Sequence, residues 1–366
     1  MNLFKNSKLF FWTVEVLLLI VIFNLLHRVS FVFYPIKVIF LTLFAPVVIA
    51  LFLYYLFNPI VSRLGKLNIP KPLSLLAILA SFLIFIMIIF AGIIPEMVQQ
   101  ASQLILSLPA IVENASNHLN QLMEGTLIEG IDIQSYFEGL DLSVLTLLTS
   151  TLSGFFSGVG NVVGSLWSAG VTIITVPVIL IYLFKDGPTL FEKIVQISPK
   201  KHQKFLENIF TSIHETLHAY ISGQAMVCLY VGVSLFLVYT IAGLPYAFLL
   251  GILAGVMDII PYAGPWIAAI PAIIVAFSVS PFVAIVIGIA MVVVQLGESY
   301  IVSPYVMGKS LHLHPIVVIF VLLIAGQLSG LVGMILGIPV FMIIKIIIQE
   351  TTNYLTKKSP VEVQEG

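Results

Sequence analysis

Long apolar stretches dominate this chain, and polar residues gather in short segments between them. A helix needs about 20 consecutive apolar residues to cross a bilayer. The runs close to that length are residues 9–26, 36–57, 73–94, 159–184, 224–242 and 282–300. This pattern predicts an all-α protein that crosses the membrane several times, with about eight membrane segments once two longer stretches are added.

Those two stretches, residues 247–278 and 315–349, are too long to cross once as straight helices. At 1.5 Å per residue they would run about 48 and 52 Å, whereas the hydrocarbon core is about 30 Å thick. Both are interrupted near the middle, by "DIIPYAGP" and by "GQLSGLVG". Each is therefore either a broken or tilted span or a re-entrant hairpin.

The alternation of apolar and polar segments also predicts how the chain is organised. Residues 200–220 carry apolar side chains at helical spacing, which is typical of an amphipathic helix. The predicted parts are a three-span region (1–94), an extracytoplasmic amphipathic segment (95–158), a fourth span (159–186), a cytoplasmic amphipathic helix (187–222), a membrane core with the interrupted segments (223–349) and a cytoplasmic tail (350–366).

Charge sets the expected orientation. Residues 95–155 contain acidic residues and no Lys or Arg, whereas residues 185–204 contain several lysines. Because Lys and Arg concentrate in cytoplasmic loops, the second segment and both termini are predicted to be cytoplasmic. Eight spans would place Lys309 outside, and six spans with two hairpins would place it inside.

Composition narrows the class of protein. The 366 residues are 60% hydrophobic and 9% charged, with a net charge of −1, so nothing points to a nucleic-acid partner. Cys228 is the only cysteine, which excludes an intrachain disulfide. The sequence has no Walker A loop, no dinucleotide fingerprint and no G-x-S-x-G elbow. We therefore expect no cofactor and no enzymatic activity.

One enzyme-like motif remains, "HETLH" at residues 214–218. H-E-x-x-H can place two zinc-binding histidines one helical turn apart, but a zinc peptidase also needs a third protein ligand. No downstream acid lies in a recognisable ligand setting. We interpret His214 and His218 as lying on the solvated face of an amphipathic helix, predict no metal site, and keep a membrane zinc peptidase as a remote alternative.

The stretch "MDIIPYAGPWIAAIP" (257–271) carries the candidate chemistry. A carboxylate at membrane depth persists where it faces a cavity, is paired or is functional. Helix breakers beside Asp258 free backbone groups that need protein or water as partners, and a pair of Gly/Pro-interrupted segments points to a transporter's binding site. Asp258 is thus the first candidate for coupling transport to a proton or cation, and Glu298 is the second. The alternative is that Asp258 only caps the helix beside the break.

Polar residues near both interruptions complete the candidate path, which is expected to be lined by Tyr262, Gln295 and Gln327. Glycine pairs at G-x-x-x-G spacing accompany them, at Gly160/Gly164, Gly251/Gly255, Gly326/Gly330 and Gly333/Gly337. Such spacing allows close helix packing, including contacts between subunits, and a hinge is the alternative.

Two regions resemble the signature regions of the autoinducer-2 exporter family of PerM-like permeases. One is residues 223–272, with "GQAMVCLY" and "MDIIPYAGPW", and the other is residues 295–340, with "QLGESYIVSPYVMGKS" and "AGQLSGLVG". The segment "IYLFKDGPTLFEKI" (181–194) is similar too. The motif residues carried over are Gln224, Asp258, Pro261, Tyr262, Gly264, Gln295, Glu298, Pro304, Gly308, His314, Pro315, Gly326, Gly330, Gly333 and Pro339.

The resemblance implies a multi-pass permease of the bacterial inner membrane that forms homo-oligomers in the lipid bilayer. It implies two activities: export of autoinducer-2, a small polar solute, and Na⁺(Li⁺)/H⁺ antiport. We predict a secondary transporter that exports a small polar solute such as autoinducer-2. The alternative is an antiporter in which one intramembrane carboxylate binds either H⁺ or a cation.

Overall fold

The computed structural model describes residues 12–18, 21, 34, 38, 42–43, 46–58, 61, 71–124, 154, 170–307 and 313–357. These residues form helices joined by short turns, and no strand occurs among them. The elements are a helix of Pro46–Asn58, α3 (Lys71–Met87), the π-helix η1 (Ile88–Ile93), α4 (Ile94–Glu124), α6 (Gly170–Ile197), α7 (Lys200–Ile241), α8 (Ala247–Met257), α9 (Ala263–Val279), α10 (Pro281–Gly297), the π-helix η2 (Glu298–Val302), α11 (Ser303–Met307) and α12 (Pro315–Lys357). The prediction of an all-α polytopic membrane protein is confirmed.

Several of these helices are long and apolar enough to cross a membrane. Within the described part of the chain they are Ala80–Ile111, Lys200–Ile241, Pro281–Met307 and Pro315–Thr356, the last of which contains a break at Ser329 and Gly330. The two parts of α6 make a further candidate if they count as one span. The predicted span 9–26 and the start of 159–184 lie largely outside the described residues, whereas the end of the predicted span 36–57 is the apolar helix Pro46–Asn58.

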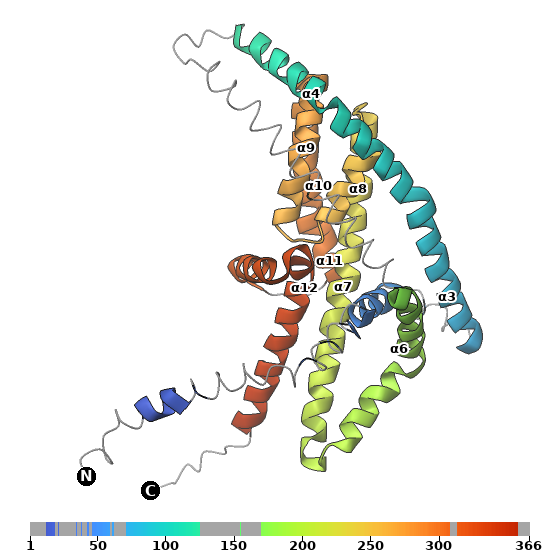
Figure 1. Cartoon of the computed structure of the whole chain (residues 1–366), viewed down its shortest axis with the longest axis vertical. Helices are drawn as coiled ribbons and strands as arrows, with labels where there is room; N and C mark the ends of the chain where they lie inside the picture. The colour runs from blue at the N-terminus through green and yellow to red at the C-terminus, as the bar shows by residue number, and fades with distance from the viewer. Residues whose placement is uncertain are drawn as a thin grey trace.

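Helix α7 is the longest element of the membrane core after α12. It runs unbroken for 42 residues and joins the amphipathic segment and the span that the sequence had suggested as separate units. The amphipathic pattern gives way to an apolar run near Gly223, and no proline lies between Lys200 and Ile241, so the helix continues through the change. Figure 1 shows α7 as a rod beside the helices that follow it.

The first interrupted stretch is a hairpin. Helix α8 ends at Met257, helix α9 begins at Ala263, and the two pack against each other, as Figure 1 also shows. A Cβ at Gly264 would collide with the backbone carbonyl of Met257, so the absence of a side chain there permits the tight return. Of the two alternatives for this stretch, the structure has the one in which the chain turns back.

The second interrupted stretch turns back as well. Helical geometry fails inside α12 at Ser329 (φ −143°, ψ 18°) and Gly330 (φ 58°, ψ −139°). Positions on either side of this break then meet: a Cβ at Gly337 would touch Ala325 and one at Gly326 would touch Met334. Only glycine readily adopts the positive φ of Gly330, which explains why the reversal falls there. Lys309 lies outside the described residues.

Helix α4 arches over the first hairpin (Figure 1) and packs on both α8 and α9. Leu104 and Leu108 are buried in the same hydrophobic core as residues of α7–α10. Two polar contacts attach the arch to the start of α8: the backbone N–H of Leu249 donates to Gln100 Oε1 (3.1 Å), and the hydroxyls of Ser107 and Tyr246 are 2.8 Å apart. The first hairpin is therefore enclosed from above.

Glycines set the close approach of α7 and α8. A Cβ at Gly255 would lie 2.7 Å from the carbonyl oxygen of Cys228 and 2.9 Å from Gly232 Cα, and one at Gly251 would lie 2.6 Å from Phe236 Cβ. The pair Gly251/Gly255 thus serves packing within the chain, as the packing interpretation expected. Gly160 and Gly164 lie outside the described residues.

Candidate functional site

A cavity of about 590 Å³ opens at the break of the first hairpin. Its walls come from α7, α8, the break, α9, α10, η2, α11 and α12. The lining residues are Tyr220, Gln224, Val231, Leu235, Ala254, Asp258, Pro261, Tyr262, Pro265, Trp266, Ala268, Ala269, Ile273, Gly288, Met291, Val292, Val294, Gln295, Glu298, Ser299, Ser303, Met307, Leu313, Val318 and Ile338. A mostly apolar pocket with a few convergent polar groups is the usual form of a small-molecule site.

Asp258 lies at the base of this cavity, directly after the last residue of α8. Its backbone N–H still donates to Ala254 O (3.1 Å), so the residue ends the helix. The residue is only 3% exposed. Its Oδ2 atom is buried and has no hydrogen-bond partner among the described residues. A buried carboxylate oxygen in that condition needs a proton, a cation or a bound hydroxyl.

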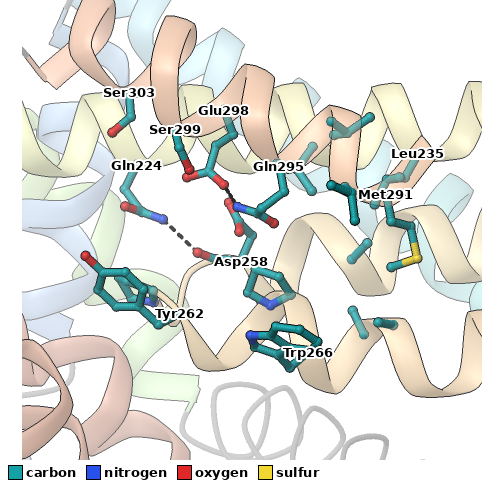
Figure 2. A pocket seen from close by; sticks show the side chains of 18 of the residues that line it. Gln224, Leu235, Asp258, Tyr262, Trp266, Met291, Gln295, Glu298, Ser299 and Ser303 are labelled. Carbon is teal, nitrogen blue, oxygen red and sulfur yellow. Dashed lines mark hydrogen bonds between the residues drawn. The ribbon is translucent and has the colours of Figure 1, made fainter. Parts of the chain in front are cut away.

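Glu298 faces Asp258 from the opposite wall, at the first residue of the π-helix η2. Gln295 Nε2 donates to Glu298 Oε2, which holds the glutamate side chain in the cavity. Figure 2 shows the Asp258 side chain pointing toward the Gln295–Glu298 pair. A short π-helix widens one turn, and such turns often occur at functional sites.

Gln224 fixes the backbone of the break. Its Nε2 donates to the carbonyl oxygen of Asp258 at 2.7 Å, and the contact is buried. The carbonyl is one of those that the end of α8 leaves without a helical partner, so the amide satisfies a group that would otherwise be orphaned in an apolar setting. The side chain of α7 thereby positions Asp258 without touching its carboxylate.

An aromatic wall, formed by Tyr262 and Trp266, lines the cavity opposite the polar cluster (Figure 2). Tyr262 has φ 66° and ψ −46°, and Ala263 N donates to Pro261 O at 2.8 Å. This is a γ-turn of the rare, strained kind. Strain at a non-glycine residue is found most often at functional sites.

The structure brings together part of the predicted site. Asp258, Glu298, Gln224, Pro261, Tyr262 and Gln295 all line the cavity. Gly264 is not part of the lining, but it permits the tight return of the hairpin. Gln224 of α7, Asp258 at the break and Glu298 of η2 are separated by 34 and 40 positions in the chain, and they share one pocket.

The other predicted residues lie elsewhere. Gln327, which was expected to line the path, is exposed at the second break and does not contact the cavity. Gly326, Gly330 and Gly333 shape the second hairpin. Pro304 is exposed on α11 and Pro339 lies within α12, both outside the cavity lining. Gly308 falls outside the described residues.

Sequence reasoning missed Trp266, Ser299 and Ser303 as cavity residues. The two serines could have been predicted from their spacing. Four residues, Met291, Gln295, Ser299 and Ser303, recur every four positions and so share one face of a helix. Trp266 follows four residues after Tyr262, which puts both rings on the face of α9 that starts at the break.

The HETLH histidines have neighbours that the sequence did not reveal. Tyr55 OH is 3.3 Å from His214 Nδ1, and the Tyr55 ring packs against His218 with centroids 6.0 Å apart. The expectation of a solvated face was therefore wrong, since both rings are half-buried. Among the described residues, no third His, Cys, Asp or Glu joins them as a metal ligand.

Comparisons with known proteins show the family of the chain. The AI-2E family transporter model matches residues 16–353. The Bacillus subtilis (strain 168) protein named "Putative transport protein YueF" is 37% identical over 342 residues, which cover 93% of this chain and 92% of that protein. YrrI from the same organism is 29% identical over 93% of this chain and 96% of its own length. "AI-2 transport protein TqsA" of Escherichia coli (strain K12) is 23% identical over 84% of this chain and 86% of its own length.

Apolar helices, two hairpins and a mostly apolar cavity with a polar cluster are the features expected of a polytopic membrane transporter. The chain belongs to the AI-2E transporter family, as the resemblance had predicted. A family made of transporters points away from catalysis, in line with the expectation for the HETLH motif.

Proposed function

We propose that this chain exports a small, neutral, hydroxyl-rich solute such as autoinducer-2 through the cavity at the first hairpin. One observation supports this most: a carboxylate–amide cluster and an aromatic wall face each other in a cavity of about 590 Å³. Carboxylates and amides hydrogen-bond hydroxyl groups, and aromatic faces cover the apolar side of a small ring. A bare cation would require neither the volume nor the aromatic wall.

The proposal also includes the location, oligomeric state and orientation of this transporter. We place it in the bacterial inner membrane as a homo-oligomer, with both termini in the cytoplasm. The lysines between residues 185 and 204 and near the end of α12 support that orientation. Relatives named as transport proteins come from bacteria such as Bacillus subtilis and Escherichia coli.

Solute exchange in proteoliposomes tests the substrate. Vesicles loaded with unlabelled autoinducer-2 would receive labelled autoinducer-2 outside, and wild type would be compared with Trp266→Ala and with empty vesicles. We expect exchange by wild type and at least about a fivefold lower rate for Trp266→Ala, because losing one ring contact costs about 1 kcal/mol or more. Folded wild-type protein that exchanges no more than empty vesicles would refute this substrate.

A second function, Na⁺(Li⁺)/H⁺ antiport, has its own supporting observation. Asp258 Oδ2 is buried without a partner among the described residues and faces Glu298. Two neighbouring carboxylates can hold either a proton or a small cation, and exchange of the two is all that antiport requires. We propose it as the alternative if solute exchange fails.

An internal pH dye tests the alternative. Adding Na⁺, Li⁺ or K⁺ outside the vesicles should change internal pH for Na⁺ and Li⁺ only, and Asp258→Asn should abolish the change because it removes the ionisable group. A pH change that is equal for all three cations, or one that persists in Asp258→Asn, would argue against antiport at this site.

A further inference from the structure

The tip of the first hairpin rests on the second hairpin. Ile260, the middle residue of the break, is only 3% exposed. It belongs to a buried cluster with Val318 and Leu322 from the first arm of α12 and Ile338 and Met342 from the second. The two hairpins thus meet through apolar side chains in this cluster.

The same contact closes one end of the cavity. Val318 and Ile338 belong both to the cluster around Ile260 and to the cavity wall, and so does Tyr220 of α7. Asp258 and Pro261, which belong to the same break as Ile260, line the cavity as well. A solute at the polar cluster is therefore separated from the far side of the second hairpin by an apolar seal.

Among the described residues, the tip has few polar attachments outside its own hairpin. Its backbone bonds run within the hairpin, from Ile260 N to Met257 O (2.9 Å) and from Gly264 N to Ile260 O (2.9 Å). Toward α7 the break has one polar attachment among the described residues, the bond from Gln224 to Asp258 O. Aliphatic contacts have no directional requirement, so the seal can separate without leaving polar groups unsatisfied.

We propose that Ile260 is a gate residue of the transport path, and that transport requires the tip of the first hairpin to separate from both arms of the second. The proposal rests on the proposed function in that the cavity is the transport site. A hydrophobic constriction excludes water and polar solutes while it is closed. Shortening the side chain at position 260 therefore opens the seal more often, and tying it to α12 keeps it shut.

Thiol labelling measures opening without any transported substrate. Because Cys228 is the only cysteine, the Cys228→Ala background can carry a single reporter, Ser303→Cys, in the cavity wall. The rate of reaction with a water-soluble maleimide would be compared in that background with and without Ile260→Ala. We expect the rate to rise about fivefold or more, which is the low end of couplings between two-state elements.

Matched variants keep this test interpretable. Ile285→Ala makes the same change on α10 at a side chain that is 60% exposed, and it should leave the labelling rate unchanged. If Ile260→Ala does not fold, Ile260→Val removes one methylene and should give a smaller rise in the same direction. Equal labelling rates in folded Ile260 and Ile285 variants would overturn the gate.

A tether tests the need for opening. Ile260→Cys and Val318→Cys in the Cys228→Ala background would be joined by a cleavable bifunctional thiol reagent. We expect cross-linking to stop solute exchange and cleavage to restore it, with each single cysteine unaffected. Exchange at an unchanged rate after cross-linking, or no cross-link at all, would overturn the proposal. If wild type exchanges no solute but Ile260→Ala still labels faster, the substrate is wrong and the gate remains.

Discussion

The two interrupted hairpins begin from the same kind of sequence and end in different surroundings. In both, apolar helices turn back at a short break that contains glycine or proline. The first break is enclosed by α7, α10 and α12, and Asp258 there is 3% exposed. At the second break Leu328 is 79% exposed, and its polar neighbours Gln327 and Ser329 are exposed too.

The two hairpins also differ in the residue that has a positive φ at the turn. The second hairpin reverses at Gly330, whereas the first has its positive φ at Tyr262. Glycine adopts such a φ without cost, and a tyrosine does so at a cost of about 1–3 kcal/mol. A break in a membrane helix thus makes a hairpin in either place, but only enclosure by other helices makes a polar site.

The largest expected difference between the hairpins concerns transport. Asp258→Asn should lower solute exchange on the order of 100-fold, equivalent to about 2.7 kcal/mol, because it removes a buried charge from the cavity. Gln327→Ala, at an exposed position, should stay within about twofold of wild type. Exchange rates in proteoliposomes with matched amounts of folded protein measure both. Equal losses would show that the second break contributes to the path after all.

The two hairpins should lose similar stability when a glycine at a close contact is replaced by alanine. Gly264→Ala and Gly333→Ala each place a Cβ against a backbone carbonyl, of Met257 and Ala325 respectively. Each should destabilise the protein by about 1–3 kcal/mol through overpacking. Gly187→Ala, where a Cβ meets nothing within 4 Å, is the control and should not destabilise. Thermal unfolding in detergent measures all three, and a stable Gly333→Ala would mean that the second hairpin is loosely packed.

Much of this architecture could be predicted from the sequence, because it depends on local patterns. Length alone showed that residues 247–278 and 315–349 could not cross once as straight helices. A carboxylate beside helix breakers pointed to Asp258, which lines the cavity. Gln295 and Glu298 could be predicted as candidate site residues because they are polar residues within an apolar run.

The remainder depends on contacts between distant segments, which no local pattern encodes. Gln327 and Gln295 look alike in sequence, yet only Gln295 has α7 and the first hairpin beside it. The polar side of the α7 amphipathic pattern suggested solvent around His214, whereas Tyr55, 159 residues away, covers it. The γ-turn at Tyr262 is equally invisible, since a bulky residue is rare at positive φ.

The strain at Tyr262 provides a smaller test of the comparison. Tyr262→Gly should raise the free energy of unfolding by about 1 kcal/mol, because the first turn would then resemble the second in backbone preference. The same variant should lower solute exchange, since the aromatic wall loses a ring. Tyr262→Phe is the control, which keeps both the ring and the strain. A Tyr262→Gly variant that gains no stability would show that the γ-turn is not strained in the protein.

The smallest expected effect concerns the arch that only the first hairpin has. Gln100→Leu removes the acceptor for Leu249 N, and Ser107→Ala removes the partner of the Tyr246 hydroxyl. Each should cost about 1 kcal/mol, the usual net value of one hydrogen bond. Hydrogen exchange should then quicken in α8 and α9 and stay unchanged in α12, because α4 encloses one hairpin and not the other. Equal acceleration in both would mean that the hairpins unfold as one unit, joined through the contact at Ile260.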